Sequence, residues 1–118
     1  MTQTNNKLAT VILVTNDGMG HADQTLQHKL IATYLKLLDD SNTLPAAICF
    51  YTDGVKLVTT GSPVLEVLRE LEAKGVHLVL CSTCLNYFGL EDQVEVGVVG
   101  GMTDIIEAHW RADKVITL

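Results

Sequence analysis

The chain has 118 residues, 47% of them hydrophobic, and a formal net charge of −6. This length and apolar share suit one domain with a real core, which needs no disulfide or metal to fold. The negative charge argues against nucleic acid or an anionic membrane as the main partner. We therefore expect a single domain over residues 1–118.

The cysteines and the N-terminal sequence bear on where the protein works. Three cysteines are too few, and wrongly spaced, for the disulfide framework of a small secreted protein. The first apolar run, Leu8–Val14, lacks a cleavage site of the A-x-A type and is too short to span a membrane. We therefore expect a cytoplasmic protein with reduced thiols.

The first half of the chain alternates strand and helix patterns. LATVILV (8–14) is a short, β-branched apolar run, which is typical of a strand buried on both faces. Asp23 can cap a helix over residues 24–40, where leucines recur at helical spacing. AAICFY (46–51) predicts a second buried strand, which ends at the turn signal Thr52-Asp53-Gly54.

The second half repeats this alternation. Ser62-Pro63 predicts a helix start, and Gly75 a helix end after Lys74. VHLVLC (76–81) predicts the third strand. The remaining expected elements are a short helix from Ser82 or Thr83 to about Phe88, ended by Gly89, a strand over 94–99, a turn at Gly100-Gly101, a helix from Met102 past His109, and a strand over 114–118.

Five strands joined by short helical connections imply right-handed crossovers and a parallel sheet. The expected fold is therefore a three-layer α/β/α sandwich with a parallel five-stranded sheet, of flavodoxin-like size. In such sheets ligands bind outside the carboxyl ends of the strands. Those ends carry residues 15–23, 52–54, 81–84 and 100–102, so Cys81 and Cys84 belong to the functional edge.

The spacing Cys81-Ser82-Thr83-Cys84 allows a reactive thiol pair, half of a metal site or two small buried side chains. A zinc site needs about four ligands, and no second ligand pair is present at a suitable spacing. A helix that begins here would lower the pKa of a thiol in its first turn and so favour the nucleophilic thiolate. Cys49, inside the second strand, is expected to be a buried core residue.

The first loop, NDGMGHAD (16–23), contains a Gly-x-Gly but no third glycine, so it is a weak signal for nucleotide binding. His21 can serve as a proton carrier or an anion partner near the thiols, although an exposed loop histidine is the simpler interpretation. Supporting site residues are expected on the same edge of the sheet. They are Asn16, Gly18, Met19, Gly20, His21, Asp53, Gly54, Ser82, Thr83, Gly101 and Met102.

Three stretches together resemble the DsrE/DsrF-like superfamily, and within it the DsrE-like domain of the YedF group. They are FYTDGVKL (50–57), residues 62–90 with the core motif CSTCLNYFGL, and VEVGVVGGMTDIIEAHWRADKVITL (94–118). The resemblance implies an α/β/α fold with a parallel five-stranded sheet, homo-oligomers such as dimers or trimers, and sulfur-relay or selenium-linked chemistry. It implies a persulfide carried on the cysteine after the third strand, which Cys81 matches, with Cys84 in the place of a second cysteine.

The leading hypothesis is a sulfur or selenium carrier in which Cys81 or Cys84 accepts a sulfane sulfur as a persulfide, while the other thiol can resolve it as a disulfide. It requires no metal or organic cofactor, and a TusA-like protein or another thiol protein would be the relay partner. The alternative is an oligomeric scaffold or small-ligand or nucleotide-binding module of the same fold.

Overall fold

Five parallel strands form one sheet in the computed structural model, which describes residues 9–118. The strands are β1 (Thr10–Val14), β2 (Ala47–Phe50), β3 (His77–Cys81), β4 (Val98–Gly100) and β5 (Lys114–Thr117). The α-helices are α1 (Gln24–Asp40), α2 (Leu65–Ala73), α3 (Ser82–Tyr87) and α4 (Met102–Arg111). Two 3₁₀ helices, η2 (Thr52–Val58) and η3 (Glu91–Gln93), complete the elements.

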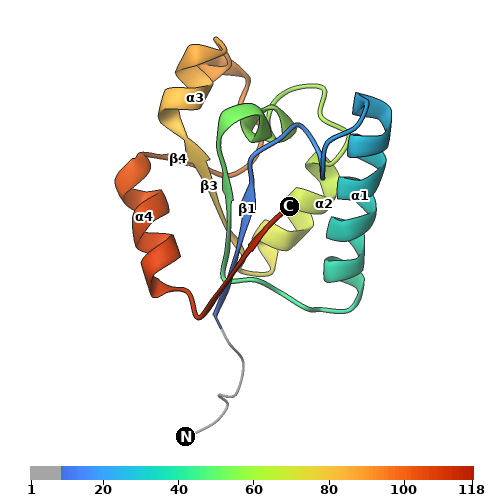
Figure 1. Ribbon diagram of the computed structural model, residues 1–118, viewed down its shortest axis with the longest axis vertical. Helices are drawn as coiled ribbons and strands as arrows, with labels where there is room; N and C mark the ends of the chain where they lie inside the picture. The colour runs from blue at the N-terminus through green and yellow to red at the C-terminus, as the bar shows by residue number, and fades with distance from the viewer. Residues whose placement is uncertain (1–8) are drawn as a thin grey trace, which may run out of the picture.

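The strand order is β4-β3-β2-β1-β5, and all neighbouring pairs are parallel (Figure 1). Because the strands run in one direction, their carboxyl ends meet at one edge. The loops that follow β2 and β3 are therefore neighbours at that edge, which decides where the thiols and their contacts lie.

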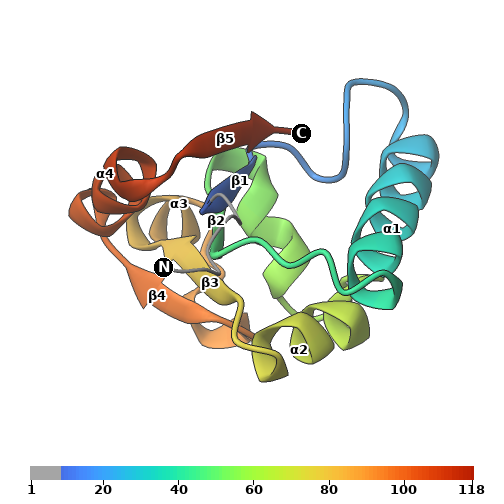
Figure 2. The ribbon, with the colours of Figure 1, turned by 90° about the horizontal axis from the view of Figure 1, so that it is seen from below.

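Helices cover both faces of the sheet, which confirms the predicted α/β/α sandwich (Figure 2). Helices α1 and α2 pack together on one face, and α4 lies on the other (Figure 2). The short helix α3 stands at the carboxyl edge and begins directly where β3 ends (Figure 1).

The two central strands explain the continuous apolar runs in the sequence. Val11–Val14 of β1 and all four residues of β2 are buried, because helices cover both faces at this point of the sheet. The edge strand β4 instead exposes Val98 and Val99. A hydrophobic core therefore holds the middle of the sheet rigid while its edges remain accessible.

Two predicted boundaries hold in detail. Helix α1 spans the predicted residues, and the Asp23 carboxylate caps it by accepting the N–H of Leu26 at 3.1 Å. Gly75 follows α2 with φ +101°, a left-handed conformation that suits a glycine after a helix. Within residues 9–118, no helix is both long enough and apolar enough to cross a membrane.

The strand predicted over residues 94–99 is wrong in its bounds. Val94 forms an isolated antiparallel bridge with Thr59, Gly97 turns the chain with φ +91°, and only Val98–Gly100 pair with β3. Val96 is nevertheless buried, so this apolar residue packs on the core from outside the sheet.

The predicted start of the second helix is early. The Ser62 hydroxyl accepts the N–H of Val64 at 3.2 Å, so Ser62-Pro63 forms a turn and α2 begins at Leu65. The 3₁₀ helix η2 was not predicted beyond the turn at its first residues. It carries the chain from β2 across the carboxyl edge and contacts α3.

Candidate functional site

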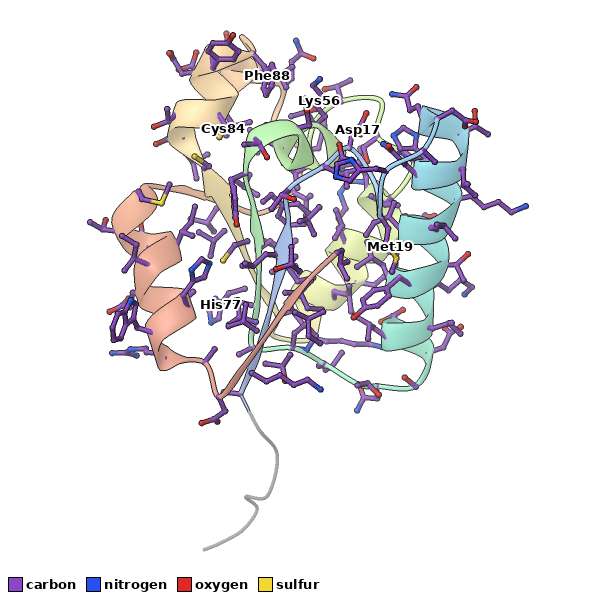
Figure 3. The ribbon with its side chains drawn as sticks, in the orientation of Figure 1. Asp17, Met19, Lys56, His77, Cys84 and Phe88 are labelled. Atoms are coloured by element: carbon purple, nitrogen blue, oxygen red, sulfur yellow. The ribbon has the colours of Figure 1, made fainter. Side chains whose placement is uncertain are left out.

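The two thiols lie at the carboxyl edge of the sheet, as the topology predicted. Cys81 is the last residue of β3, opposite Gly100 of β4, and Cys84 lies on the first turn of α3 (Figure 3). Only 2% of Cys81 is exposed, whereas Cys84 is partly exposed. Cys84 is therefore the more accessible of the two residues.

Thr52 supplies the main polar contact of the Cys84 sulfur. Its backbone N–H donates to Cys84 Sγ with an N···S distance of 3.0 Å. The two residues are distant in sequence, but β2 and β3 are neighbours, so the turn after β2 reaches the helix that follows β3. The sequence predicted that this turn lies at the site, but the predicted site residues were Asp53 and Gly54, not Thr52.

The expectation of a lowered thiol pKa is wrong for Cys84. Burial raises the pKa of Cys84 and the hydrogen bond with Cys81 raises it further, while the Thr52 N–H lowers it. The net direction is upward because desolvation of the sulfur outweighs a single amide donor. The helix expected to stabilise the thiolate has only six residues.

Asp53 and Gly54 hold the turn after β2 in place, and their contacts are not with a sulfur. Asp53 Oδ1 lies 2.8 Å from Lys56 Nζ, and that ammonium sits 4.6 Å from the centre of the Phe88 ring. A Cβ at Gly54 would collide with the carbonyl oxygen of Val14, so only glycine lets the turn pack this closely on β1. These contacts fix η2 against both β1 and the end of α3.

The first loop forms a hydrogen-bonded unit beside this turn. Asn16 Nδ2 donates to Gly20 O at 2.7 Å and lies 3.2 Å from Nδ1 of His21. Gly18 packs against Gln27, with no room for a side chain, and Met19 N–H donates to Gln27 O at 3.1 Å. The contacts of His21 are thus with its own loop and not with a sulfur.

Asp17 and His28 form a polar pair that the sequence analysis missed. His28 Nε2 lies 3.0 Å from Asp17 Oδ1, and Gln24 Nε2 donates to the other carboxylate oxygen at 2.9 Å. Through this contact His28, on α1, holds the first loop against the helix. An Asp and a His eleven residues apart carry no sequence signal of pairing until the loop is folded back.

The last predicted residues lie around the ends of β3 and β4. Ser82 and Thr83 are exposed on the first turn of α3, and neither caps that helix. Gly101 precedes α4, and its N–H donates to Asp104 Oδ2 at 2.8 Å. Met102 is exposed at the start of α4. Gly101 therefore serves the start of α4, and β4 pairing places it next to the end of β3.

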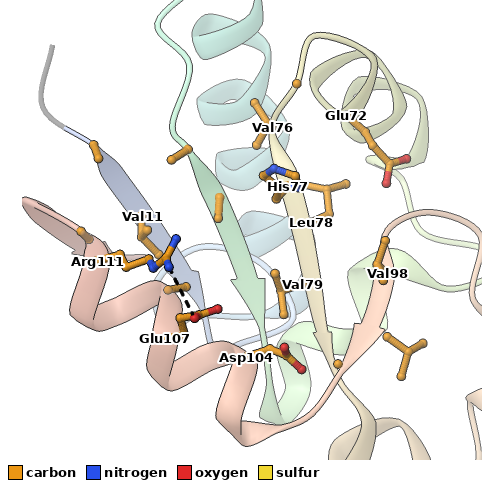
Figure 4. A pocket seen from close by; sticks show the side chains of 18 residues that line it. Val11, Glu72, Val76, His77, Leu78, Val79, Val98, Asp104, Glu107 and Arg111 are labelled. Carbon is orange, nitrogen blue, oxygen red and sulfur yellow. Dashed lines mark ion pairs between the residues drawn. The ribbon is translucent and has the colours of Figure 1, made fainter. Parts of the chain in front are cut away.

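Two cavities adjoin these elements. The one at the carboxyl edge has a volume of about 340 Å³ and is lined in part by Asp17, His28, Lys56 and Phe88. The larger, about 610 Å³, lies between α4 and the sheet and is mainly apolar (Figure 4). It contains no cysteine and reaches His77 at the start of β3, the end of that strand remote from the thiols (Figures 3 and 4).

Cys49 is fully buried in β2, as predicted, and burial raises its pKa to about 11. No three His, Cys, Asp or Glu side chains of residues 9–118 gather closely enough to hold a metal ion. The chemistry that this edge offers is therefore that of one accessible thiol, Cys84, with a buried thiol, Cys81, beside it.

The sequence of residues 8–118 matches the DsrE/DsrF-like family. The chain belongs to this family. The match covers all five strands and includes both thiols of the carboxyl edge, and the family is linked to sulfur relay. No curated protein sequence matches the chain.

Solved structures share the fold at low sequence identity. The ychN protein of E. coli aligns with a TM-score of 0.68 and 20% identity, over 94% of this chain and all of that one. MTH1491 of Methanobacterium thermoautotrophicum, a protein of unknown function, aligns with a TM-score of 0.69 and 19% identity, over 95% of this chain and all of that one. BT1422 of Bacteroides thetaiotaomicron, also of unknown function, aligns with a TM-score of 0.67 and 16% identity, over 93% of this chain and 95% of that one. At these identities the comparisons establish the fold alone.

Proposed function

We propose that the protein is a sulfur carrier that holds a sulfane sulfur as a persulfide on Cys84. The observation that carries this proposal is that Cys84 is partly exposed and has the Thr52 N–H directed at its sulfur, beside the buried Cys81. Family position favours Cys81 as the relay thiol. Exposure favours Cys84, because a donor and an acceptor must both reach the reacting sulfur.

The transfer needs no external oxidant. The Cys84 thiolate attacks the terminal sulfur of a donor persulfide, a new S–S bond forms on Cys84, and the donor leaves as a thiolate. A partner thiolate then takes the same sulfur and restores the Cys84 thiolate. Alternatively, the Cys81 thiolate attacks Sγ of Cys84, which forms a Cys81–Cys84 disulfide and releases hydrosulfide, so that the two thiols supply both electrons.

The raised pKa of Cys84 shapes this chemistry. The resting group is the thiol, so transfer accelerates as pH rises toward the Cys84 pKa. A resting thiol also limits unwanted reaction with oxidants, because the thiolate is the reactive form. We therefore expect slow uptake at neutral pH unless a docked partner changes the surroundings of the sulfur.

Mass spectrometry of the reduced protein tests the proposal directly. After incubation with glutathione persulfide and alkylation, the protein should gain about 32 Da, the mass of one sulfur atom, on Cys84, and a thiol reductant should remove it. Cys84→Ser should abolish the gain and Cys49→Ala, the matched control, should keep it. Absence of a gain on either residue of the pair, together with thermal stabilisation by a nucleotide or flavin, would favour a ligand-binding module instead.

Members of the family are often oligomeric, and one surface suits contact with a second copy. Met102, Ile106 and Trp110, at helical spacing, form an exposed apolar stripe along α4, and Val98 and Val99 of β4 are exposed as well. Exposed apolar side chains that share one helix face often mark a protein–protein contact. We therefore propose that the protein forms a homo-oligomer through this surface.

The remaining parts of the proposal rest on the sequence motifs. They are placement in the YedF group, selenium as an alternative cargo, a TusA-like or other thiol protein as relay partner, and a cytoplasmic location, where reduced thiols persist.

A further inference from the structure

Thr52 has an unusual backbone conformation beside the reactive sulfur. Its φ is +49°, and besides Asn42 it is the only residue other than glycine among residues 9–118 with a positive φ. For a β-branched residue this conformation is a genuine outlier, since the side chain crowds the backbone. Asparagine adopts it more readily, and Asn42 lies in the turn after α1, away from the thiols. Thr52 is therefore the strained position among the residues that the structure describes.

The strain at Thr52 is held by contacts on both sides. The Thr52 hydroxyl lies within hydrogen-bond distance of the carbonyl oxygens of Thr15 and Tyr51, and donates its one proton to them. Tyr51 N–H donates to Val14 O at 3.1 Å, and Gly54 packs on that same carbonyl. Strained residues persist where surrounding structure fixes them, and such residues cluster at functional sites.

The strained conformation has one visible consequence for the thiols. The Thr52 N–H belongs to the Tyr51–Thr52 peptide plane, which lies between Tyr51 with ψ 172° and Thr52 with φ +49°, and it is directed at Cys84 Sγ with an N···S distance of 3.0 Å. A rotation of this plane that returned the φ of Thr52 to negative values would take the N–H off the sulfur, because the ψ of Tyr51 and the φ of Thr52 change together when the plane turns. This amide is also the group that lowers the Cys84 pKa against the effect of burial.

We propose that Thr52 is a positioning residue for sulfur chemistry at Cys84: its hydroxyl holds a left-handed backbone that keeps the N–H on the Cys84 sulfur. The role in sulfur transfer rests on the proposed function. The effect of Thr52 on the reactivity of the Cys84 thiol does not, because it can be measured whether or not sulfur is transferred. The amide stabilises negative charge on Sγ when the thiolate forms and when it leaves as sulfur passes to an acceptor.

Three substitutions separate the hydroxyl from the backbone. Thr52→Ser keeps the hydroxyl and should behave like the wild type. Thr52→Val keeps the size but removes the hydroxyl, and its β-branched side chain favours extended backbone, so the N–H should leave the sulfur. Thr52→Gly also lacks the hydroxyl but reaches the left-handed region freely, so its effect should be smaller.

The measurement is the pH dependence of Cys84 alkylation by iodoacetamide in a Cys81→Ala background, located by fragmentation mass spectrometry. In Thr52→Val the apparent Cys84 pKa should rise by about one pH unit, so that alkylation at neutral pH falls about tenfold. Thr33→Val removes a hydroxyl from the exposed face of α1 and should leave the reaction unchanged.

An unchanged Cys84 pKa in folded Thr52→Val would overturn the inference. If Thr52→Val fails to fold, Thr52→Ala decides: it also lacks the hydroxyl and, unlike glycine, does not reach the left-handed region freely, so a Cys84 pKa equal to that of the wild type would show that the hydroxyl does not position the amide. Failure of the sulfur carrier is a different result: wild-type Cys84 would show the amide effect on its pKa and yet gain no sulfur from glutathione persulfide.

Discussion

Substitution of Gly54 by alanine should destabilise the protein through a single steric conflict. The new Cβ would overlap the carbonyl oxygen of Val14, a backbone atom of central strand β1. A flexible side chain could move aside at little cost, but β1 is hydrogen-bonded to β2 and β5 on its two sides. The turn must therefore shift away from the sheet, and with it the residues that contact Cys84.

The size of the effect follows from overpacking a rigid region. Such changes cost about 3 kcal/mol when the neighbour cannot yield. For a chain of 118 residues the entropy of unfolding is about 0.25 kcal/mol per kelvin. The midpoint of thermal unfolding should accordingly fall by about 12 °C in Gly54→Ala.

Thermal unfolding followed by circular dichroism measures this fall, with Gly61→Ala as the matched control. Gly61 has φ +91° but open space where a Cβ would lie, so alanine there meets only backbone strain. That strain costs about 1 kcal/mol, or about 4 °C. If Gly54→Ala unfolds within about 2 °C of the wild type, or above Gly61→Ala, the close packing of the turn on β1 is not rigid and the reasoning fails.

Three further outcomes are expected. Cys49, whose pKa is raised to about 11 by burial, should resist alkylation at pH 8 in the folded protein and react only on unfolding in urea. Cys84, which is partly exposed, should already react in the folded protein. Lys74→Met should destabilise the protein at pH 7, because Lys74 Nζ lies 2.7 Å from Asp39 Oδ1 and holds the Asp39 pKa below 3.8. Because the Asp39 pKa is lowered in the folded protein, the ion pair stabilises the protein above the ordinary pKa of Asp, and this contribution is lost as the pH falls below that range. The difference in urea unfolding between the variant and the wild type should therefore shrink in acid, and a difference independent of pH would contradict the ion pair. Trp110→Glu should shift the protein to smaller species in analytical ultracentrifugation without lowering its unfolding midpoint, since Trp110 is 85% exposed.

The layers and the site edge could be predicted from the sequence because they depend on local patterns. The buried runs in β1 and β2 and the Asp23 cap of α1 each report their own surroundings. Parallel topology then places the residues after Phe50 and Cys81 at one edge without knowledge of any contact. The resemblance to the DsrE/DsrF-like superfamily then suggested sulfur transfer as the role of the cysteine pair.

Contacts between distant segments could not be predicted in the same way. Thr52 follows a β-strand and precedes an Asp-Gly turn signal, but threonine carries no preference for the left-handed conformation that its Thr15 contact supports. The sequence also does not reveal that burial raises the pKa of Cys84 by more than the Thr52 amide lowers it. The direction of a thiol pKa depends on the balance of opposing terms, and only the folded arrangement sets that balance.

The central claim is that Cys84 is the thiol that carries sulfur. The most direct measurement is the division of transferred sulfur between Cys84 and Cys81 at a low ratio of glutathione persulfide to protein, read by fragmentation mass spectrometry after alkylation. We predict that the first sulfur appears on Cys84 and that Cys81→Ala keeps full uptake. Sulfur found first on Cys81, with uptake retained in Cys84→Ser, would contradict the account.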